Sequence, residues 1–289
     1  MRTSTRMVVL GGFKGVLDLI LAIASVAYGL RRLSRFWTGA AIRVMRTSDN
    51  ALLDVGFTST GDLDIVTLLA FVGSANGEIV IWYDQSGNGR HAVSITGSRP
   101  RIVSNGVLET LNGKPAISFD GLTQFLSLPT SGAPTQNSSL IGVFQTTSPA
   151  VTSAGFINIS NVVDSPEIRV GVGMGGSTTT YRAYWNGAYA TIDDPAVNFQ
   201  NRSVFNVSFA ASGGVITNTV LVNGSEALSA SGGGTWIGVN EFTIGRYVRT
   251  NAMRAGIAQE LISFSSVLST TDRQTLERNQ GNFYSITVA

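Results

Sequence analysis

Pairs of neighbouring carboxylates are the residues in this sequence best placed to do acid–base chemistry. Asp193 stands next to Asp194, and Asp164 lies three residues before Glu167. Cleavage of a sugar linkage with retention needs two carboxyl groups about 5 to 5.5 Å apart, one as nucleophile and one as acid. Both pairs lie in stretches with the composition of loops. They are candidates for catalysis, but the pattern favours solvated loop acids.

His91 is the only histidine in the chain, and cysteine is absent. A Ser-His-Asp arrangement would have to use His91, which ends a turn-rich segment where packing or turn hydrogen bonds explain it better. Without cysteine there is no thiolate nucleophile, no disulfide and no thiolate-bound metal. We therefore expect no catalytic residue and no cofactor.

Three aromatic residues, Tyr181, Trp185 and Tyr189, repeat at intervals of four. Residues at even spacing point to one side of a strand, so these three could form a flat platform for a glycan ring. The same side chains could instead pack in the core, which the pattern favours. The sequence leaves carbohydrate binding open as one of two interpretations.

A turn-rich block closes a predicted strand at 78–83. It comprises Tyr83, Asp84, Gln85, Ser86, Gly87, Asn88 and Gly89. An aspartate in such a turn accepts hydrogen bonds from backbone amides two residues on, and glycine adopts backbone angles closed to other residues. We expect a rigid structural turn. A calcium site at Asp84 and Asn88 is the alternative, but the block has too few carboxylates to enclose a cation, so no metal is expected.

The elements that must position these residues are mainly short strands. Apolar runs closed by Gly, Asn, Ser or Pro predict strands at 115–119, 140–145, 155–159, 168–172, 182–188, 204–209, 219–222, 242–247 and 260–264. Short strands with frequent turn signals are typical of an antiparallel sandwich. The dipeptide Asn223-Gly224 predicts a two-residue hairpin turn, since both residues tolerate positive φ.

Two helices are also expected. The first runs from Thr60 as its cap to Gly73 as its stop, with Asp62 and Asp64 in the first turn. The second follows a capping box that starts at Ser269 near the C-terminus, and we expect it to dock on the sandwich.

The N-terminal region has basic residues before an apolar run at 16–30, which superficially resembles a signal peptide. Asp18 interrupts this run, and a membrane span needs about 20 apolar residues. We expect an arm at 1–15 followed by one sandwich domain at 16–289, with no membrane span.

The composition points to an assembling protein. Hydrophobic residues make up 43% of the chain and charged residues 13%, about half the usual charged share of roughly 25%. The net charge is +2 without a basic tract, which argues against nucleic acid as a partner. A charge-poor surface rich in Ser, Thr and Gly suits assembly with further copies.

Short blocks spread along the chain carry a resemblance to a known family. They lie at 28–33, 38–44, 46–50, 82–91, 113–121 and 272–284, and the fourth reads Trp-Tyr-Asp-Gln-Ser-Gly-Asn-Gly-Arg-His. In this order they resemble the arabinofuranosidase-B-like domain, found in glycosidases and in bacteriophage structural proteins. The resemblance covers about residue 16 to the end. It implies an all-β, concanavalin-A-like antiparallel β-sandwich (jelly roll) with a few short helices.

The resemblance also bears on catalysis. The related enzymes carry a Glu on a central strand, an Asp after a Gly-rich strand near the C-terminus, and adjacent cysteines at the sugar site. The comparable stretches here, 168–175 and 243–248, contain no carboxylate. The resemblance therefore implies the frame of a glycosidase without its acid pair, and we expect no enzyme activity.

The leading hypothesis from the sequence is a bacteriophage virion structural protein, a tail-fibre, tail-tip or capsid-surface component located in the virion. Its expected partners are itself, as a homo-oligomer such as a trimer, other virion proteins and a cell-surface glycan. The alternative is an arabinofuranosidase-type glycoside hydrolase using carboxylates such as Asp193 or Glu167. A third interpretation is a structural protein without a glycan ligand.

Overall fold

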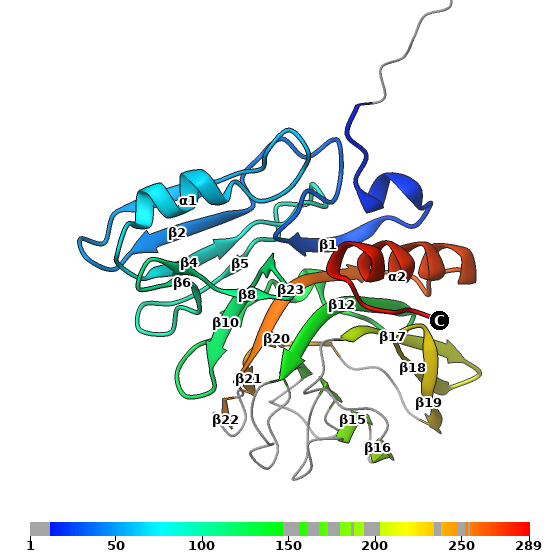
Figure 1. The fold of residues 1–289 in the computed structure, drawn as a ribbon. Coiled ribbons are helices and arrows are strands. Elements are labelled where there is room, and N and C mark those ends of the chain that lie inside the picture. Colours follow the sequence, from blue (N-terminus) through cyan, green and yellow to red (C-terminus); the bar gives the residue numbers. More distant parts are fainter. Residues whose placement is uncertain are drawn as a thin grey trace, which may run out of the picture.

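The computed structural model describes residues 12–146, 156–160, 168–172, 180–185, 188–193, 203–233, 238–247, 252–253 and 255–289. Within these residues the chain forms two packed antiparallel layers of strands with two α-helices and two short 3-10 helices (Figure 1). The predicted all-β sandwich with a few short helices is confirmed.

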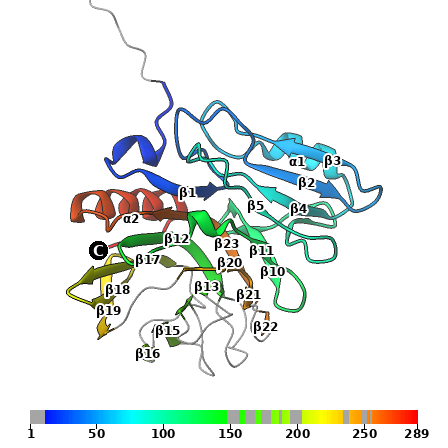
Figure 2. The same ribbon diagram turned by 180° about the vertical axis from the view of Figure 1, so that it is seen from behind.

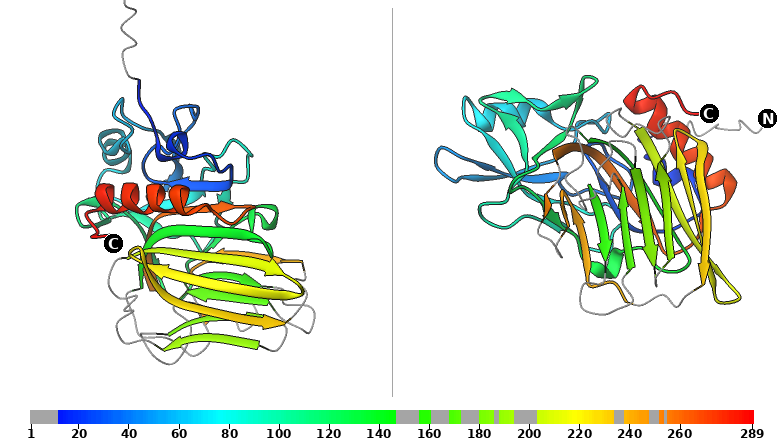
Figure 3. Two further views of the ribbon diagram at one scale, coloured as in Figure 1. Left: turned by 90° about the vertical axis from the view of Figure 1, so that its right-hand side faces the viewer. Right: turned by 90° about the horizontal axis from the view of Figure 1, so that it is seen from below.

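The first layer is built around one long strand from near the C-terminus. In spatial order it contains β1 (Ala24–Gly29), β23 (Ala255–Phe264), β12 (Ser138–Thr146), β17 (Ser203–Ser212), β18 (Val215–Val222) and β19 (Ser225–Gly233). One edge of β23 pairs with β12, and its other edge pairs with β1 and with β10 (Ile117–Asp120). Strands from the two ends of the sequence therefore lie side by side, as the colours in Figure 3 show.

The second layer begins with two very short strands. In spatial order it contains β5 (Ala92–Val93), β11 (Leu126–Ser127), β20 (Glu241–Ile244), β13 (Ile157–Ser160), β14 (Ile168–Val172), β15 (Thr180–Trp185) and β16 (Ala188–Asp193). All of these pairings are antiparallel, so residues paired across the layer share one face.

Strands from the N-terminal half connect the two layers. They are β2 (Ile42–Arg46), β3 (Leu52–Val55), β4 (Gly77–Trp82), β6 (Arg101–Ser104) and β7 (Val107–Leu108). β4 lies beside β5 of the second layer and pairs with it (Figure 2). β4 also pairs with β6, and β6 pairs with β10. Two small ribbons pair β8 (Thr110–Leu111) with β9 (Lys114–Pro115) and β21 (Arg246–Tyr247) with β22 (Ala252–Met253). The second layer therefore continues through β5 into β4, β2 and β3.

Aromatic side chains fill the space between the layers. Phe144 contacts Phe156 and Phe205, with ring centroids 5.6 and 4.6 Å apart, and all three are buried. Such pairs add about 0.5 to 1.5 kcal/mol each to the stability gained by burying their area. A second apolar cluster lies between the outer face of the first layer and α2, around Ile262 and Leu276. That face is therefore closed by a helix, as Figure 3 shows.

The apolar run near the N-terminus packs into the domain. It forms a 3-10 helix, η1 (Val16–Leu19), and then β1, in which every residue is buried. A second 3-10 helix, η2 (Thr130–Gly132), precedes β12. Among the described residues, the helices are too short or too polar to cross a membrane.

The first α-helix, α1 (Ile65–Val72), begins later than predicted. Asp64 caps it by accepting a backbone hydrogen bond of 3.1 Å from the first turn. The prediction of Thr60 as the cap is wrong, because the chain at Asp62 still forms a β-bridge with Arg31. Local pairing therefore delays the start of the helix.

The C-terminal helix, α2 (Thr270–Tyr284), begins where the capping box predicts. The Ser269 hydroxyl accepts a hydrogen bond from the Asp272 amide at 3.1 Å. The Asp272 carboxylate accepts hydrogen bonds from the amides of Leu21 and Ala22, both at 3.2 Å. The cap therefore also ties α2 to the N-terminal segment.

The predicted hairpin turn is confirmed. Asn223 (φ 51°) and Gly224 (φ 83°) form a two-residue turn between β18 and β19. The single strand predicted at 182–188 is wrong, because β15 ends and β16 begins within it. The strand predicted at 242–247 is divided by Gly245, whose φ of 87° turns the chain.

Candidate functional site

The outer side of β20 and β13 is polar, although both strands help to form the core. Phe242 and Ile244 of β20 are 1% exposed and belong to the core between the layers. The alternate residues Glu241 and Thr243 therefore point to the opposite side, together with Asn158, which pairs with Thr243. We call these three residues the polar face.

The polar face is covered by the chain that follows β20. The Asn158 side-chain amide donates a hydrogen bond of 2.7 Å to the Arg246 carbonyl, and the Thr243 hydroxyl donates to the same oxygen. The turn at Gly245 makes this possible, and a Cβ there would lie 2.8 Å from Phe119. Glu241 is only 6% exposed even though it faces away from the core.

Glu241 also begins a row of polar residue types across the second layer. It pairs with Ser160, which pairs with Arg169, and that residue pairs with Tyr184. Tyr184 pairs with Tyr189. Carboxylate, hydroxyl and guanidinium groups together are the types that bind the hydroxyls of a sugar.

The three aromatic residues predicted as a platform belong to this part of the layer, where the register places Tyr189 on the side of Tyr184 and not on that of Tyr181 and Trp185. Tyr181 and Trp185 belong to β15, and Tyr189 belongs to β16, where it pairs with Tyr184. The positions of the three side chains lie outside the described residues. Carbohydrate binding by these residues therefore stays a prediction.

Of the predicted acids, Asp164, Glu167 and Asp194 lie outside the described residues. Asp193 is the last residue of β16, four strand steps from Glu241 through β13, β14 and β15. Four steps of about 4.8 Å place the two backbones roughly 19 Å apart along the layer. Acid pairs in glycoside hydrolases are about 5 to 9.5 Å apart, so these two cannot form one.

Glu241 was missed by the sequence analysis. It lies just before the stretch 243–248, in which a carboxylate was sought. The alternation Glu-Phe-Thr-Ile is the signal that could have found it, because it places Glu241 and Thr243 on one side of a strand and the apolar residues on the other.

The turn-rich block has its hydrogen-bonding capacity committed to the fold. One oxygen of the buried Asp84 carboxylate accepts from the amides of Ala27 (2.8 Å) and Ser86 (2.9 Å). The other accepts from the Ser86 hydroxyl (2.8 Å) and the Arg90 amide (3.1 Å). Asn88 donates its side-chain amide to the carbonyls of Ala24 and Ser25 in β1. Four donors on one carboxylate agree with a structural turn, and the absence of a calcium site stays a prediction.

The other residues of the turn-rich block also make structural contacts. The Gln85 side chain accepts from the Leu33 amide and donates to the Gly29 and Arg31 carbonyls. Gly87 (φ 89°) and Gly89 (φ 69°) adopt left-handed backbone angles. Tyr83 donates its hydroxyl to a carboxylate on β3. These contacts hold the block against β1, the segment that follows it and β3.

A second buried carboxylate, Glu260 of β23, is also fully engaged. It accepts two hydrogen bonds from Arg31, at 2.7 and 3.2 Å, and one from Tyr284 at 3.0 Å. Gln280 of α2 donates a fourth at 3.0 Å. Burial raises the pKa of the Tyr284 hydroxyl well above its usual value, so it remains a donor. We call these residues the Glu260 cluster, which joins β1, β23 and α2.

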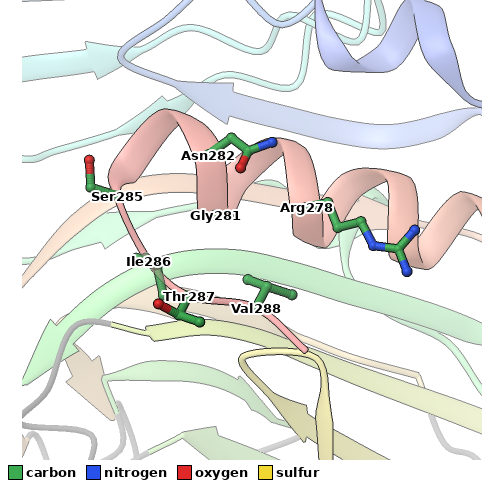
Figure 4. Close-up of a pocket in the computed structure, with 7 residues that line it drawn as sticks. All are labelled: Arg278, Gly281, Asn282, Ser285, Ile286, Thr287 and Val288. Atoms are coloured by element: carbon green, nitrogen blue, oxygen red, sulfur yellow. The ribbon is translucent and has the colours of Figure 1, made fainter.

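A hollow of about 580 Å³ lies between the end of α2 and the C-terminal segment (Figure 4). Its walls include Arg278, Asn282 and Thr287 but no carboxylate. It therefore lacks the groups needed for glycoside hydrolysis.

Comparison with solved structures shows the fold. The chain is similar to a GH54 α-L-arabinofuranosidase soaked with a cyclic sulfate inhibitor, with a TM-score of 0.64 and 15% identity over 89% of this chain and 62% of that one. An arabinofuranosidase complexed with arabinofuranosyl-α-1,2-xylobiose gives a TM-score of 0.65 and 15% identity over 91% and 63%. The chain thus spans less than two thirds of either. No family model and no curated protein matches.

These comparisons correct the leading hypothesis from the sequence. The similar structures are glycoside hydrolases, and nothing in the comparisons points to a bacteriophage origin. The expectations of a virion structural role and of no enzyme activity are therefore wrong, and the hydrolase alternative has the better support. The two stretches compared with the related enzymes, 168–175 and 243–248, did not include Glu241.

Proposed function

We propose that this chain is a glycoside hydrolase domain of the arabinofuranosidase type, with Glu241 as a carboxylate that contacts the sugar. The observation that carries the proposal is the position of Glu241. It is a carboxylate withdrawn from water on the side of a core strand that faces away from the core. The likeness to arabinofuranosidases over about nine tenths of the chain supports the same conclusion.

The neighbours of Glu241 serve to hold the site in shape. Asn158 and Thr243 use their side-chain donors on the Arg246 carbonyl, which fixes the covering segment over the strand. A fixed, water-poor environment strengthens hydrogen bonds to the charge that develops during bond cleavage. These two residues are therefore positioning residues.

Hydrolysis needs a second carboxyl group, and chain connectivity ranks the candidates. Residues 161–167, which contain Asp164 and Glu167, connect Ser160 to the start of β14. Ser160 is the residue that pairs with Glu241, so this connection leaves the layer beside the proposed site. Glu167 is therefore a better candidate for the partner acid than Asp193.

The test is release of nitrophenol from 4-nitrophenyl α-L-arabinofuranoside. We expect Glu241→Gln to lower kcat by about 10² to 10⁴-fold, the usual effect of removing a group that transfers a proton. The matched control is Glu226→Gln, because Glu226 is exposed on β19. It should leave kcat unchanged.

The same assay ranks the second acid. Glu167→Gln should abolish release, whereas Asp193→Asn should retain it. A wild-type chain that releases no sugar from arabinofuranosides, or a Glu241→Gln variant with full activity, would contradict the proposal.

A further inference from the structure

A second hollow lies at the far end of the second layer, away from Glu241. Its volume is about 340 Å³, and it is bounded by the connection between β1 and β2 and by residues at and after the end of β3. The side chains that matter for its chemistry are Arg32, Trp37, Thr38, Asp54, Phe57 and Thr58. This volume lies in the range of sites that bind small molecules.

Trp37 provides a fixed aromatic surface in this hollow. Its indole nitrogen donates to the Ala40 carbonyl at 3.0 Å, which sets the orientation of the ring. A Cβ at Gly39 would lie 2.6 Å from the ring, so glycine is needed for the ring to rest there. Trp37 is half-buried and therefore still presents part of its ring to a ligand.

Asp54 provides a fixed acceptor. Arg43 donates to both of its oxygens, at 2.8 and 2.6 Å, and the Tyr83 hydroxyl donates to one of them at 2.8 Å. The hydrogen bond from Arg43 lowers the pKa of Asp54, and burial with the Asp54 bond raises the pKa of Tyr83 to about 12. A carboxylate has about four acceptor positions, so the side chain, 42% exposed, keeps capacity for a ligand.

The charges in the hollow indicate a neutral ligand. The charge of Asp54 is already balanced by its pair with Arg43. The Arg32 guanidinium donates to two backbone carbonyls, and Thr38 and Thr58 are exposed hydroxyls. An aromatic ring beside matched donors and acceptors fits a sugar, which presents C–H groups on its faces and hydroxyls at its edge. A cation would gain little from a carboxylate that is already paired with Arg43, and an anion would meet that carboxylate.

The hollow and Glu241 lie on the same side of one continuous ladder of strands. Asp54 pairs with Arg43, Arg43 with Ile81, Ile81 with Val93, Val93 with Ser127, and Ser127 with Thr243 of the polar face. Each link joins directly paired residues, which point to the same side of a sheet.

Burial agrees with this register. Val93 is 42% exposed, and Ile81 and Ser127 are half-buried. The residues next to them in sequence, Trp82 and Leu126, are fully buried in the core. The row from Asp54 to Thr243 crosses five strand spacings of about 4.8 Å, or roughly 24 Å, which is several sugar units long.

We propose that the hollow between Trp37 and Asp54 binds a neutral sugar ring of an extended oligosaccharide whose other end reaches Glu241. Binding in the hollow stands by itself, and only the placement of the far end rests on the proposed function. The site would make the chain bind long glycans more tightly than short ones.

The test uses the full chain with Glu241→Gln, so that turnover does not consume the ligand. Soluble arabinoxylan is the long probe and arabinofuranosyl-α-1,2-xylobiose the short one, with binding measured by calorimetry. Adding Trp37→Ala should weaken arabinoxylan binding at least tenfold and change binding of the short probe less than twofold. Phe36→Ala is the matched control, because Phe36 is 76% exposed beside Trp37 but does not line the hollow.

Further outcomes separate the two proposals. Asp54→Asn should weaken arabinoxylan binding as Trp37→Ala does, and thermal unfolding should show both variants folded. Binding that depends on Trp37 in a chain without hydrolytic activity would keep the hollow and remove the proposed function. Equal arabinoxylan binding by the Trp37→Ala and Phe36→Ala variants, or no binding by either the parent or the variants, would overturn the inference.

Discussion

Two groups of carboxylates in this molecule are used in opposite ways. In the Glu260 cluster and the turn-rich block, each buried carboxylate accepts four hydrogen bonds from the protein itself. On the outer side of the second layer, Asp54 is fixed by only three and remains partly exposed. The difference teaches that the carboxylates of the most recognisable sequence blocks hold the fold. Ligand binding is expected instead at a carboxylate such as Asp54, which still has an acceptor position to offer.

The largest expected effect comes from breaking the Glu260 cluster. Arg31→Ala leaves a buried carboxylate without its cation, which typically costs about 3 to 5 kcal/mol of unfolding free energy. Chemical denaturation would measure this loss. Arg35→Ala removes an exposed arginine from the same segment and should stay within about 0.5 kcal/mol. Equal midpoints for the two variants would refute a structural role for the cluster.

A smaller loss is expected in the turn-rich block. Asp84→Asn replaces one accepting oxygen by a donor that faces amide hydrogens, and it should lower the unfolding free energy by about 1.5 to 3 kcal/mol. Asp49→Asn is the matched control, because it affects an exposed pair with Arg46 and should change the midpoint less. If added calcium restored the unfolding midpoint of the Asp84→Asn variant, that result would show that the block is a metal site.

The pH dependence of stability tests another buried carboxylate, Glu277 of α2. Burial raises the pKa of Glu277, although its 2.6 Å pair with Arg273 opposes the shift. The folded state therefore binds this proton more tightly than the unfolded state. The contribution of Glu277 to stability is highest below its ordinary pKa of 4.5 and decreases as the pH rises through the folded value.

The measurement compares Glu277→Gln with the wild type in denaturant melts from about pH 4 to 7. The variant should gain stability relative to the wild type as the pH rises. A constant difference across this range would contradict the raised pKa.

The smallest stability effect is expected at the second hollow. Asp54→Asn breaks a partly exposed ion pair with Arg43, so the unfolding free energy should fall by less than about 1 kcal/mol. Thermal melts would show a shift of only a few degrees. A loss as large as that of Asp84→Asn would place Asp54 with the structural carboxylates instead.

The sequence predicted the layers better than the site. Short sequence motifs predicted correctly the features that depend only on neighbouring residues, such as the Asn223-Gly224 turn and the Ser269 cap. They failed at Thr60, because a bridge between Asp62 and Arg31 depends on residues far apart in sequence.

The site could not be read from the sequence for the same reason. Glu241 becomes notable only through its pairing with β13 and its cover, which need the register of strands more than 80 residues apart. The link between Asp54 and Thr243 likewise depends on the two-residue strands β5 and β11, which no periodicity reveals. Predicted acids and aromatics at 164–194 were chosen by type and spacing alone.

The covering segment at Arg246 has a consequence for how this protein can diversify. Asn158 and Thr243 donate hydrogen bonds to a main-chain carbonyl oxygen, which every amino acid supplies. The side chain at position 246 takes no part in these hydrogen bonds and lies over Phe125. Substitutions at position 246 can therefore change the surface beside Phe125 while the hydrogen bonds from Asn158 and Thr243 to the main chain remain.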